Sequence, residues 1–541
     1  MGGPVRIHDA RWIDARGAIR EGAILLAEGR IHLHRGVSRL PGDGLVIDGR
    51  DRLILPGLID PHVHFRQPGG ARVEGVANGS RAAVVGGVTA VLEMPNTRPP
   101  TSTPARLAAK KALFRRLCRT NWGLFAATPG RWESSGGPEN GCGMGLSGQP
   151  ADPRGAGIPA DTGSLAGSEG GSAETLAHWP ASDVAANKIF LAGSKAFPAR
   201  TPTDQPVGGI AAGEIRVAHS GTSPAAGPGG RPAGRPTGRP VCGIAAGKIF
   251  LARSGACPAV TDVEQLARLF ATFPRVAIHA EDETAFPARP AGEPLPHALA
   301  RPREGIVSAL ARIEAALDAA RRESGREPRV ILLHVSTREE LAWIRRLKAA
   351  GRDLWAEACF HYLFFTAADQ RRVGPRLQVN PPLREEADRA ALREALRDGT
   401  IDFLATDHAP HPPAAKAGEA APSGMPGVEW FLPLLGRLVE DGVVTWAQAA
   451  RLGAGGAAEA YGLAGRGVLT DGVPADLTVI RCARPGKLPH PTIVTRAGYN
   501  PYAGLAFPWV VDAVFVGGHP ALLHGEVQAS PPGKDLYDDR P

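Results

Sequence analysis

Apolar and polar positions alternate with a period of two at both ends of the chain. Over the first fifty residues, short apolar stretches such as AILLAEGRIHLHRG are separated by Gly and Asp. The pattern returns after Gly467, in ADLTVIRC and WVVDAVFVGG. Such alternation predicts half-buried antiparallel strands. Because neither end is long enough to close a good core alone, we expect both ends to pair into one small β domain.

The middle of the chain alternates apolar strand-like runs with amphipathic helical segments. One predicted helix covers EGIVSALARIEAALDAARRES, in which Ile306, Leu310, Ile313 and Leu317 recur at helical spacing. It separates the strand-like runs RVAIHAED and RVILLHVST. Strict alternation over roughly eight strands predicts an α/β fold, a (β/α)8 TIM-like barrel with a small composite β-sandwich domain from both termini. The predicted boundaries are 1–55 and 466–541 for the sandwich and 56–465 for the barrel.

A segment of different character interrupts the predicted barrel at about residues 131–245. It contains GTSPAAGPGGRPAGRPTGRP, a composition that builds neither a packed helix nor a central strand, so we expect an insertion. A degenerate repeat runs through it, as VAANKIFLAGSKA, GIAAGEIRVAHSG and GIAAGKIFLARSGA. The spaced arginines of this segment are expected to be solvated.

Composition narrows the class of protein. The 541 residues carry a formal net charge of +8, but the basic residues are scattered, which argues against a nucleic-acid-binding surface. The start of the chain lacks the apolar core of a signal peptide, and no apolar run reaches the length of a membrane span. Six cysteines without a CxxC pair indicate reduced thiols. We therefore expect a cytoplasmic enzyme with a small-molecule substrate and neither nucleic-acid nor membrane partners.

Metal-ligating residue types stand at the ends of the apolar runs. His62 and His64, in LILPGLIDPHVHFRQPGG, share one face of a strand and can bind one ion together. His279, His334 and Asp407 end three further runs. Each alone could be a core, surface or capping residue, but the carboxyl ends of barrel strands meet on one face. Four imidazoles and a carboxylate there predict one or two divalent ions such as zinc.

Several motifs carry a resemblance to a known family. DPHVHFRQPGG, GGVTAVLEMPNT, AIHAEDE, LLHVSTREEL, VNPPLRE and ATDHAPH follow one another in the order found in dihydroorotases of the amidohydrolase superfamily. The resemblance implies reversible hydrolysis of dihydroorotate to N-carbamoyl-aspartate, a step of pyrimidine biosynthesis, with zinc as cofactor. It also implies that Asp407 accepts and returns the proton, and that Arg66, Asn96 and His411 bind the substrate. Asn380 is a weaker candidate for the same pocket.

The resemblance also implies a carboxylated lysine that bridges two metal ions at the end of the fourth barrel strand. The KIF lysine occurs twice, as Lys188 and Lys248, and the middle repeat copy has Glu214 instead. We expect Lys248 to be the metal ligand, because an ordinary helix and interval separate it from the His279 strand. If neither lysine reaches the site, the enzyme binds a single metal.

Two other functions remain open from the sequence. One is a related cyclic amidase, namely a dihydropyrimidinase (hydantoinase) or an allantoinase. The other is an inactive dihydroorotase-like partner of aspartate transcarbamoylase. The retained histidines and Asp407 favour an active enzyme. A homo-oligomer and a complex with aspartate transcarbamoylase are both compatible with this prediction.

Overall fold

The computed structural model describes residues 3–129, 243–288, 295–418, 420–483 and 493–538, all within one compact unit. Lys188 and the first two copies of the repeat lie outside the described residues. The third copy, from Gly243, is described and contains a strand of the barrel.

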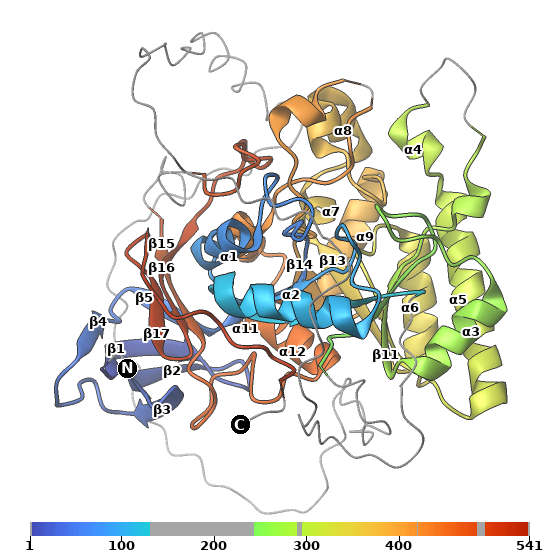
Figure 1. Cartoon of the computed structure of the whole chain (residues 1–541). Coiled ribbons are helices and arrows are strands. Elements are labelled where there is room, and N and C mark those ends of the chain that lie inside the picture. Colours follow the sequence, from blue (N-terminus) through green and yellow to red (C-terminus); the bar gives the residue numbers. More distant parts are fainter. Residues whose placement is uncertain (1–2, 130–242, 289–294, 419, 484–492, 539–541) are drawn as a thin grey trace, which may run out of the picture. The chain divides into compact units, whose positions relative to one another are not determined.

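Strands from both ends of the chain form one nine-stranded sheet, in which blue and red segments lie side by side (Figure 1). Its order is β18-β17-β16-β15-β5-β1-β2-β3, and β4 pairs with β1. The two ends meet where β5 and β15 pair antiparallel, with Leu477 opposite Pro56. The predicted composite β domain is thus confirmed. Its strands are β1 (Val5–Ile13), β2 (Ile19–Ala27), β3 (Arg30–Arg35), β4 (Leu45–Asp48), β5 (Arg52–Pro56), β15 (Leu477–Cys482), β16 (Trp509–Val516), β17 (His519–Leu523) and β18 (Glu526–Val527).

Parallel strands in the middle of the chain form the barrel. One run of pairing joins β6, β7 and β8, and a second joins β9 through β14 in chain order. The two runs are joined where the Ala245 amide, just before β10, donates to the Leu124 carbonyl at the end of β8. The barrel closes where Val63 on β6 forms a parallel β-bridge with His408, just after β14. The predicted barrel is therefore confirmed. Its strands are β6 (Leu58–Val63), β7 (Val88–Glu93), β8 (Asn121–Leu124), β9 (Ala126–Ala127), β10 (Gly247–Phe250), β11 (Arg275–His279), β12 (Arg329–Leu332), β13 (Leu354–Cys359) and β14 (Phe403–Ala405).

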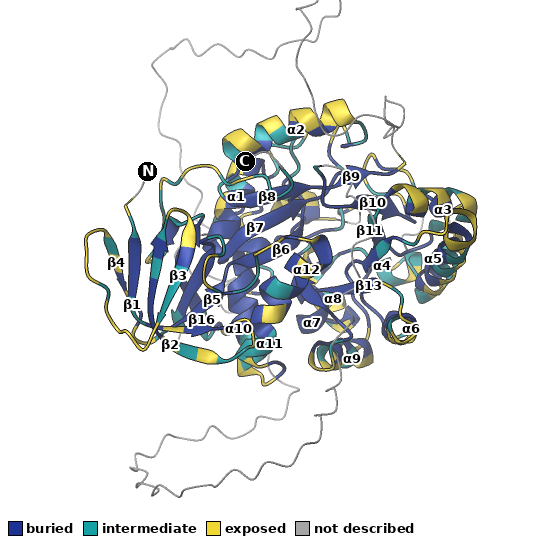
Figure 2. Cartoon of the chain, turned by 90° about the horizontal axis from the view of Figure 1, so that it is seen from below, coloured by how far each residue is buried: buried dark blue, intermediate teal, exposed yellow. Residues whose placement is uncertain are grey.

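Helices cover the outside of the barrel, with buried strands inside and exposed residues on the outer helix faces (Figure 2). The predicted helix over 304–324 is confirmed as α5, whose Ile306, Ile313 and Leu317 face the core. Another helix, α6, begins at a capping box in which Thr337 and Glu340 satisfy each other's backbone amides. The helices are α1 (Val76–Val85), α2 (Pro104–Leu117), α3 (Val263–Thr272), α4 (His297–Ala300), α5 (Arg303–Ser324), α6 (Arg338–Ala349), α7 (Phe360–Phe364), α8 (Ala367–Val373), α9 (Glu386–Arg397), α10 (Phe431–Glu440), α11 (Trp446–Ala450) and α12 (Gly456–Tyr461).

A buried carboxyl group ties the first and last barrel strands together. Asp60 on β6 accepts hydrogen bonds from the Thr406 amide at 3.1 Å and the Thr406 hydroxyl at 2.5 Å. Burial raises the pKa of Asp60 to about 7. This contact fixes the chain immediately before Asp407 against the strand that carries His62.

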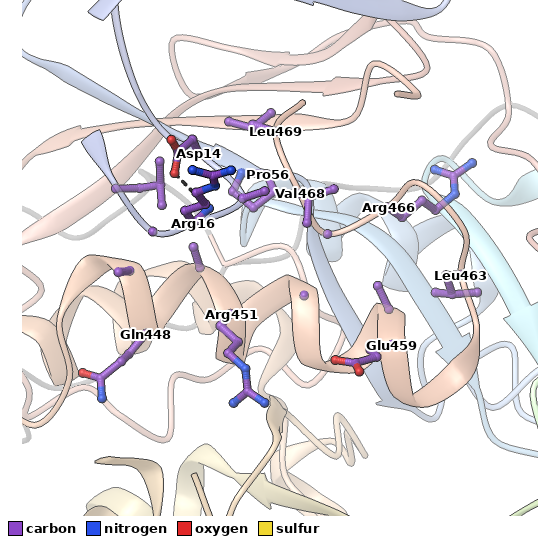
Figure 3. A pocket seen from close by; sticks show the side chains of 18 of the residues that line it. Asp14, Arg16, Pro56, Gln448, Arg451, Glu459, Leu463, Arg466, Val468 and Leu469 are labelled. Atoms are coloured by element: carbon purple, nitrogen blue, oxygen red, sulfur yellow. Dashed lines mark hydrogen bonds between the residues drawn. The ribbon is translucent and has the colours of Figure 1, made fainter. Parts of the chain in front are cut away.

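A cavity of about 780 Å³ lies between the β1–β2 turn and the helical segment from α11 to α12 (Figure 3). Its walls include the small apolar residues Ala447, Ala450 and Ala458. None of the residues that line it is a predicted metal or substrate ligand. Among the described helices, none combines the length and the apolar character needed to cross a membrane.

Candidate active site

The structure brings the predicted metal ligands together at the carboxyl ends of the barrel strands. His62 lies on β6 and His64 just beyond it, while His279 ends β11. His334 and Asp407 each lie two residues beyond a strand end, and both have a positive φ, of 39° and 46°. For non-glycine residues such a backbone is uncommon and strained, and it occurs at functional sites.

Asp407 lies between the first two histidines. Its Oδ1 is 3.2 Å from His62 Nε2 and 3.0 Å from His64 Nε2. Burial opposes ionisation of Asp407, but the His62 and His64 rings outweigh it and hold the pKa of this carboxyl well below its usual range. Asp407 is therefore an anion at neutral pH, able to accept a proton or bind a cation.

Each of these two histidines has an acceptor on its other nitrogen. His62 Nδ1 lies 2.8 Å from Glu357 Oε1, and His64 Nδ1 lies 2.8 Å from Asn96 Oδ1. Because both acceptors require an N–H, each ring carries a proton on Nδ1 and directs its Nε2 at Asp407 and the centre of the site. Outer hydrogen bonds of this kind orient metal-binding histidines in proteins.

His279 and His334 form the second half of the cluster. His279 Nε2 lies 3.0 Å from Glu281 Oε2, whereas His279 Nδ1 faces His334 Nε2 at 2.9 Å. Glu281 is held in turn by Arg301, whose Nη2 donates to it at 2.6 Å. With its proton on Nε2, His279 has its lone pair on Nδ1. This lone pair and His334 Nε2 face each other.

The chemistry of this donor set fits divalent cations. His62, His64 and Asp407 each offer an atom within 4.8 Å of the other two, and all three are buried. Burial lowers the pKa of His64 to about 3, so its ring is neutral, as a metal ligand must be. Burial opposes the charged form of His62, but Asp407 and Glu357 outweigh it and raise the pKa of this ring. The surroundings of His62 thus stabilise a positive charge, which a metal ion can supply.

Lys248, on β10, belongs to the same cluster. It is 1% exposed, and its Nζ lies 4.7 Å from the centre of the Phe250 ring. Burial lowers the pKa of Lys248 to about 8, against the opposing effect of Glu357 and Asp407. A buried lysine with a depressed pKa has an accessible neutral amine, which is the form that reacts with carbon dioxide to give a carbamate.

Arg66 and His411, two predicted substrate ligands, lie side by side. Arg66 Nη2 is 3.2 Å from His411 Nε2. Within the described part of the chain, Arg66 makes no ion pair, and its buried Nε has no hydrogen-bond partner. Burial and the neighbouring Arg66 charge lower the pKa of His411 to about 4. A neutral histidine therefore accepts one Arg66 N–H and leaves the rest of the guanidinium for an anion.

The remaining predicted polar residues lie nearby. Asn96 has its oxygen on His64, and its amide donates to Ser254 Oγ at 3.1 Å. The buried Asn380 Oδ1 has no partner among the described residues. The substrate-binding roles of both asparagines stay predictions.

Sequence reasoning missed Glu357 and Glu281, the two buried acceptors that orient histidines. Glu357 Oε1 also accepts the His334 amide at 3.1 Å. The available signal was an acidic residue within or just after an apolar strand, as in LWAEAC and AIHAED. Such a residue is rarely buried without a partner.

Comparison with known proteins agrees with this site. The family model described as "Amidohydrolase family" matches residues 53–128 and 329–521. A dihydroorotase of Bacillus caldolyticus is 30% identical over 483 residues, covering 87% of this chain and 88% of that protein. A dihydroorotase of Lactiplantibacillus plantarum is also 30% identical, covering 90% and 91%.

Solved structures share the fold. The L-hydantoinase (dihydropyrimidinase) of Arthrobacter aurescens has a TM-score of 0.69 at 21% identity, covering 97% of each chain. A D-hydantoinase (dihydropyrimidinase) from Thermus sp. has a TM-score of 0.68 at 18% identity, covering 98% of this chain and 100% of that one. The chain belongs to the amidohydrolase family, and the two relatives given above, which match it along most of its length, are dihydroorotases.

Proposed function

We propose that this enzyme is a dihydroorotase, which interconverts dihydroorotate and N-carbamoyl-aspartate. The observation that carries the proposal is the unpaired Arg66 guanidinium next to the histidine cluster. Arg66 is partly buried and its Nε is fully buried, and a guanidinium removed from water without a carboxylate partner is costly unless a ligand supplies the anion. Dihydroorotate carries a carboxylate beside its cyclic amide, whereas hydantoin, dihydrouracil and allantoin carry none.

We propose zinc as the cofactor, one or two ions per chain. His62, His64 and Asp407 would hold one ion, and His279 and His334 the second. Lys248, as a carbamate, would supply negative oxygens to both. Bound zinc lowers the pKa of water and polarises the amide carbonyl.

Asp407 has the position and charge of the proton carrier. In hydrolysis, a water oxygen adds to the ring amide carbon, the carbon–nitrogen bond breaks, and one proton must travel from that water to the departing nitrogen. The ionised Oδ1 of Asp407 lies at the centre of the site and can accept this proton and then return it. His62 and His64 keep Asp407 ionised, so it is free to accept the proton, and its lowered pKa makes the return of that proton the easier of the two transfers.

Arg66 and His411 would bind the substrate carboxylate. The guanidinium offers a planar fork that matches two carboxylate oxygens. With one N–H directed at His411, the fork keeps a fixed orientation relative to the histidine cluster. Fixing the carboxylate holds the scissile amide in place for attack.

Steady-state assays with five substrates test the function. We expect turnover of dihydroorotate and of N-carbamoyl-aspartate in the reverse direction, with hydantoin, dihydrouracil and allantoin at least about a hundredfold worse in kcat/KM. Preferred turnover of a substrate without a carboxylate would instead assign a related cyclic amidase. Fewer than one bound metal ion per chain together with no turnover would indicate an inactive partner protein.

The cellular location and the assembly are part of the same proposal. We propose that the enzyme acts in the cytoplasm, where pyrimidine synthesis takes place, as a homo-oligomer or in a complex with aspartate transcarbamoylase. Size-exclusion chromatography with light scattering, with and without the transcarbamoylase of the same organism, distinguishes these forms.

A further inference from the structure

Lys416 is a buried cation that is bound by backbone carbonyls. It lies in the loop between β14 and α10 and is 2% exposed. Its Nζ donates to the carbonyls of Gln378 at 3.1 Å, Pro422 at 2.8 Å and Gly424 at 2.8 Å. These three bonds account for all three of its N–H donors. A lysine in a loop is normally solvated, so complete burial on three carbonyls indicates a specific task.

Lys416 binds the backbone on both sides of Ser423. Pro422 and Gly424, whose carbonyls bind Lys416, flank this residue directly. Gln378 reinforces the same segment from the opposite side, because its side-chain amide donates to the Ala421 carbonyl at 2.7 Å. The Gly424 amide in turn donates to the Gln378 carbonyl at 2.8 Å.

We call Lys416, Gln378 and the segment 421–424 that they bind the loop clamp. Ser423 connects the loop clamp to the proposed carboxylate site. The His411 ring lies against this segment, since a Cβ atom added at Gly424 would be 3.4 Å from His411 Cδ2, and the Ser423 backbone carbonyl faces the ring as an acceptor. Because His411 Nε2 faces Arg66, the nitrogen that donates to Ser423 is Nδ1. With its proton on Nδ1, the neutral ring has its lone pair on Nε2, as needed to accept an N–H from Arg66.

We propose that Lys416 is a positioning residue for substrate binding: it fixes the Ser423 carbonyl, which orients His411 and thereby the Arg66 guanidinium. The inference rests on the proposed function, since it assigns Lys416 to the recognition of the substrate carboxylate. Lys416 itself does not reach the substrate in this arrangement. Its removal leaves the Pro422 and Gly424 carbonyls without their donor and frees the segment 421–424 to move.

The first variant is Lys416→Met, which keeps most of the side-chain length and removes the charge and donors. We expect KM for dihydroorotate to rise about tenfold or more while kcat stays within about threefold, because the chemical groups are untouched. Lys534→Met is the matched control, since Lys534 is an exposed lysine and the same substitution there should leave both constants unchanged. Hydrogen exchange of residues 409–425 should accelerate in the first variant only.

A double-mutant cycle distinguishes positioning from general damage. If Lys416 acts through His411, KM of His411→Ala/Lys416→Met should match that of His411→Ala within about twofold. An unchanged KM in Lys416→Met, or its full effect repeated on the His411→Ala background, would overturn the proposal. Should Lys416→Met fail to fold, Gln378→Leu loosens the same segment and is subject to the same comparison.

The wild-type enzyme separates this inference from the proposed function. Turnover of dihydroorotate by the wild type with no effect of Lys416→Met refutes the role of Lys416 alone. No turnover by the metal-loaded wild type refutes the proposed function and, with it, the inference.

Discussion

Replacing Arg66 with methionine should abolish recognition of the substrate carboxylate. Among the described residues, Arg66 Nε has no hydrogen-bond partner, and Arg66 Nη2 has one, His411 Nε2 at 3.2 Å. Two N–H groups on one side of the guanidinium are therefore available for two carboxylate oxygens. Hydrogen bonds to charged groups contribute about 1.5–3 kcal/mol each, so losing both should cost about 3–6 kcal/mol. This corresponds to a decrease in kcat/KM of about 10²–10⁴-fold.

The assay follows dihydroorotate hydrolysis spectrophotometrically over a range of substrate concentrations. Arg72→Met is the matched control, because Arg72 lies in the same loop, is exposed and should contribute nothing. Arg66→Lys should fall between Arg66→Met and the wild type, since an ammonium group cannot form the planar fork. Metal content should be equal in all variants.

Two results would refute this reasoning. If Arg66→Met kept kcat/KM within about threefold of the wild type, the guanidinium would not bind the substrate. If Arg66→Met lost its metal, the activity loss would have a different cause, and Arg66 would be part of the framework of the cluster.

Three further predictions concern groups buried around the site. Glu357→Gln should weaken zinc binding about 10–100-fold in a chelator competition assay, because Glu357 orients His62, and unchanged affinity would contradict this role. Lys248→Met should lose most activity and at least one bound ion by metal analysis, whereas Lys188→Met should lose neither; the reverse result would identify Lys188 as the bridging ligand. Burial raises the pKa of Glu340 to about 7, well above the ordinary pKa of a glutamate, so the folded state retains a proton that the unfolded state releases, and stability falls as pH rises toward 7. The melting temperature of Glu340→Gln relative to the wild type should therefore increase from pH 5 to pH 8, and a constant difference would contradict the assignment.

The structure brings together the residues that the sequence predicted as metal ligands, and their signal in the sequence is local. His62 and His64 are two residues apart at a strand end, and the barrel places every such end on one face. The α5 helix was equally predictable, since its apolar residues follow the helical period. The contact between His279 and His334, by contrast, could be seen only in the structure.

The acceptors behind the histidines were not predictable in the same way. Glu357 lies in a strand that is buried along its whole length, and its partners, His62 and the His334 amide, come from two other strands. Nothing in the spacing of the chain links these residues. Lys416 is a similar case, because its partners are backbone carbonyls, which carry no residue-type signal.

These two cases suggest how catalytic and recognition elements are held in this enzyme. Carboxylates orient His62 and His279: Glu357 lies on β13 and Glu281 just beyond the end of β11. His411 lies instead on a loop, where no strand can hold it, and the clamp is a lysine that gathers backbone carbonyls. A lysine ammonium group can hold a loop in this way because it donates to several backbone carbonyls at once, even where the loop forms no β-strand. It follows that damage to the loop clamp should weaken substrate binding selectively, whereas damage to the barrel carboxylates should release the metal.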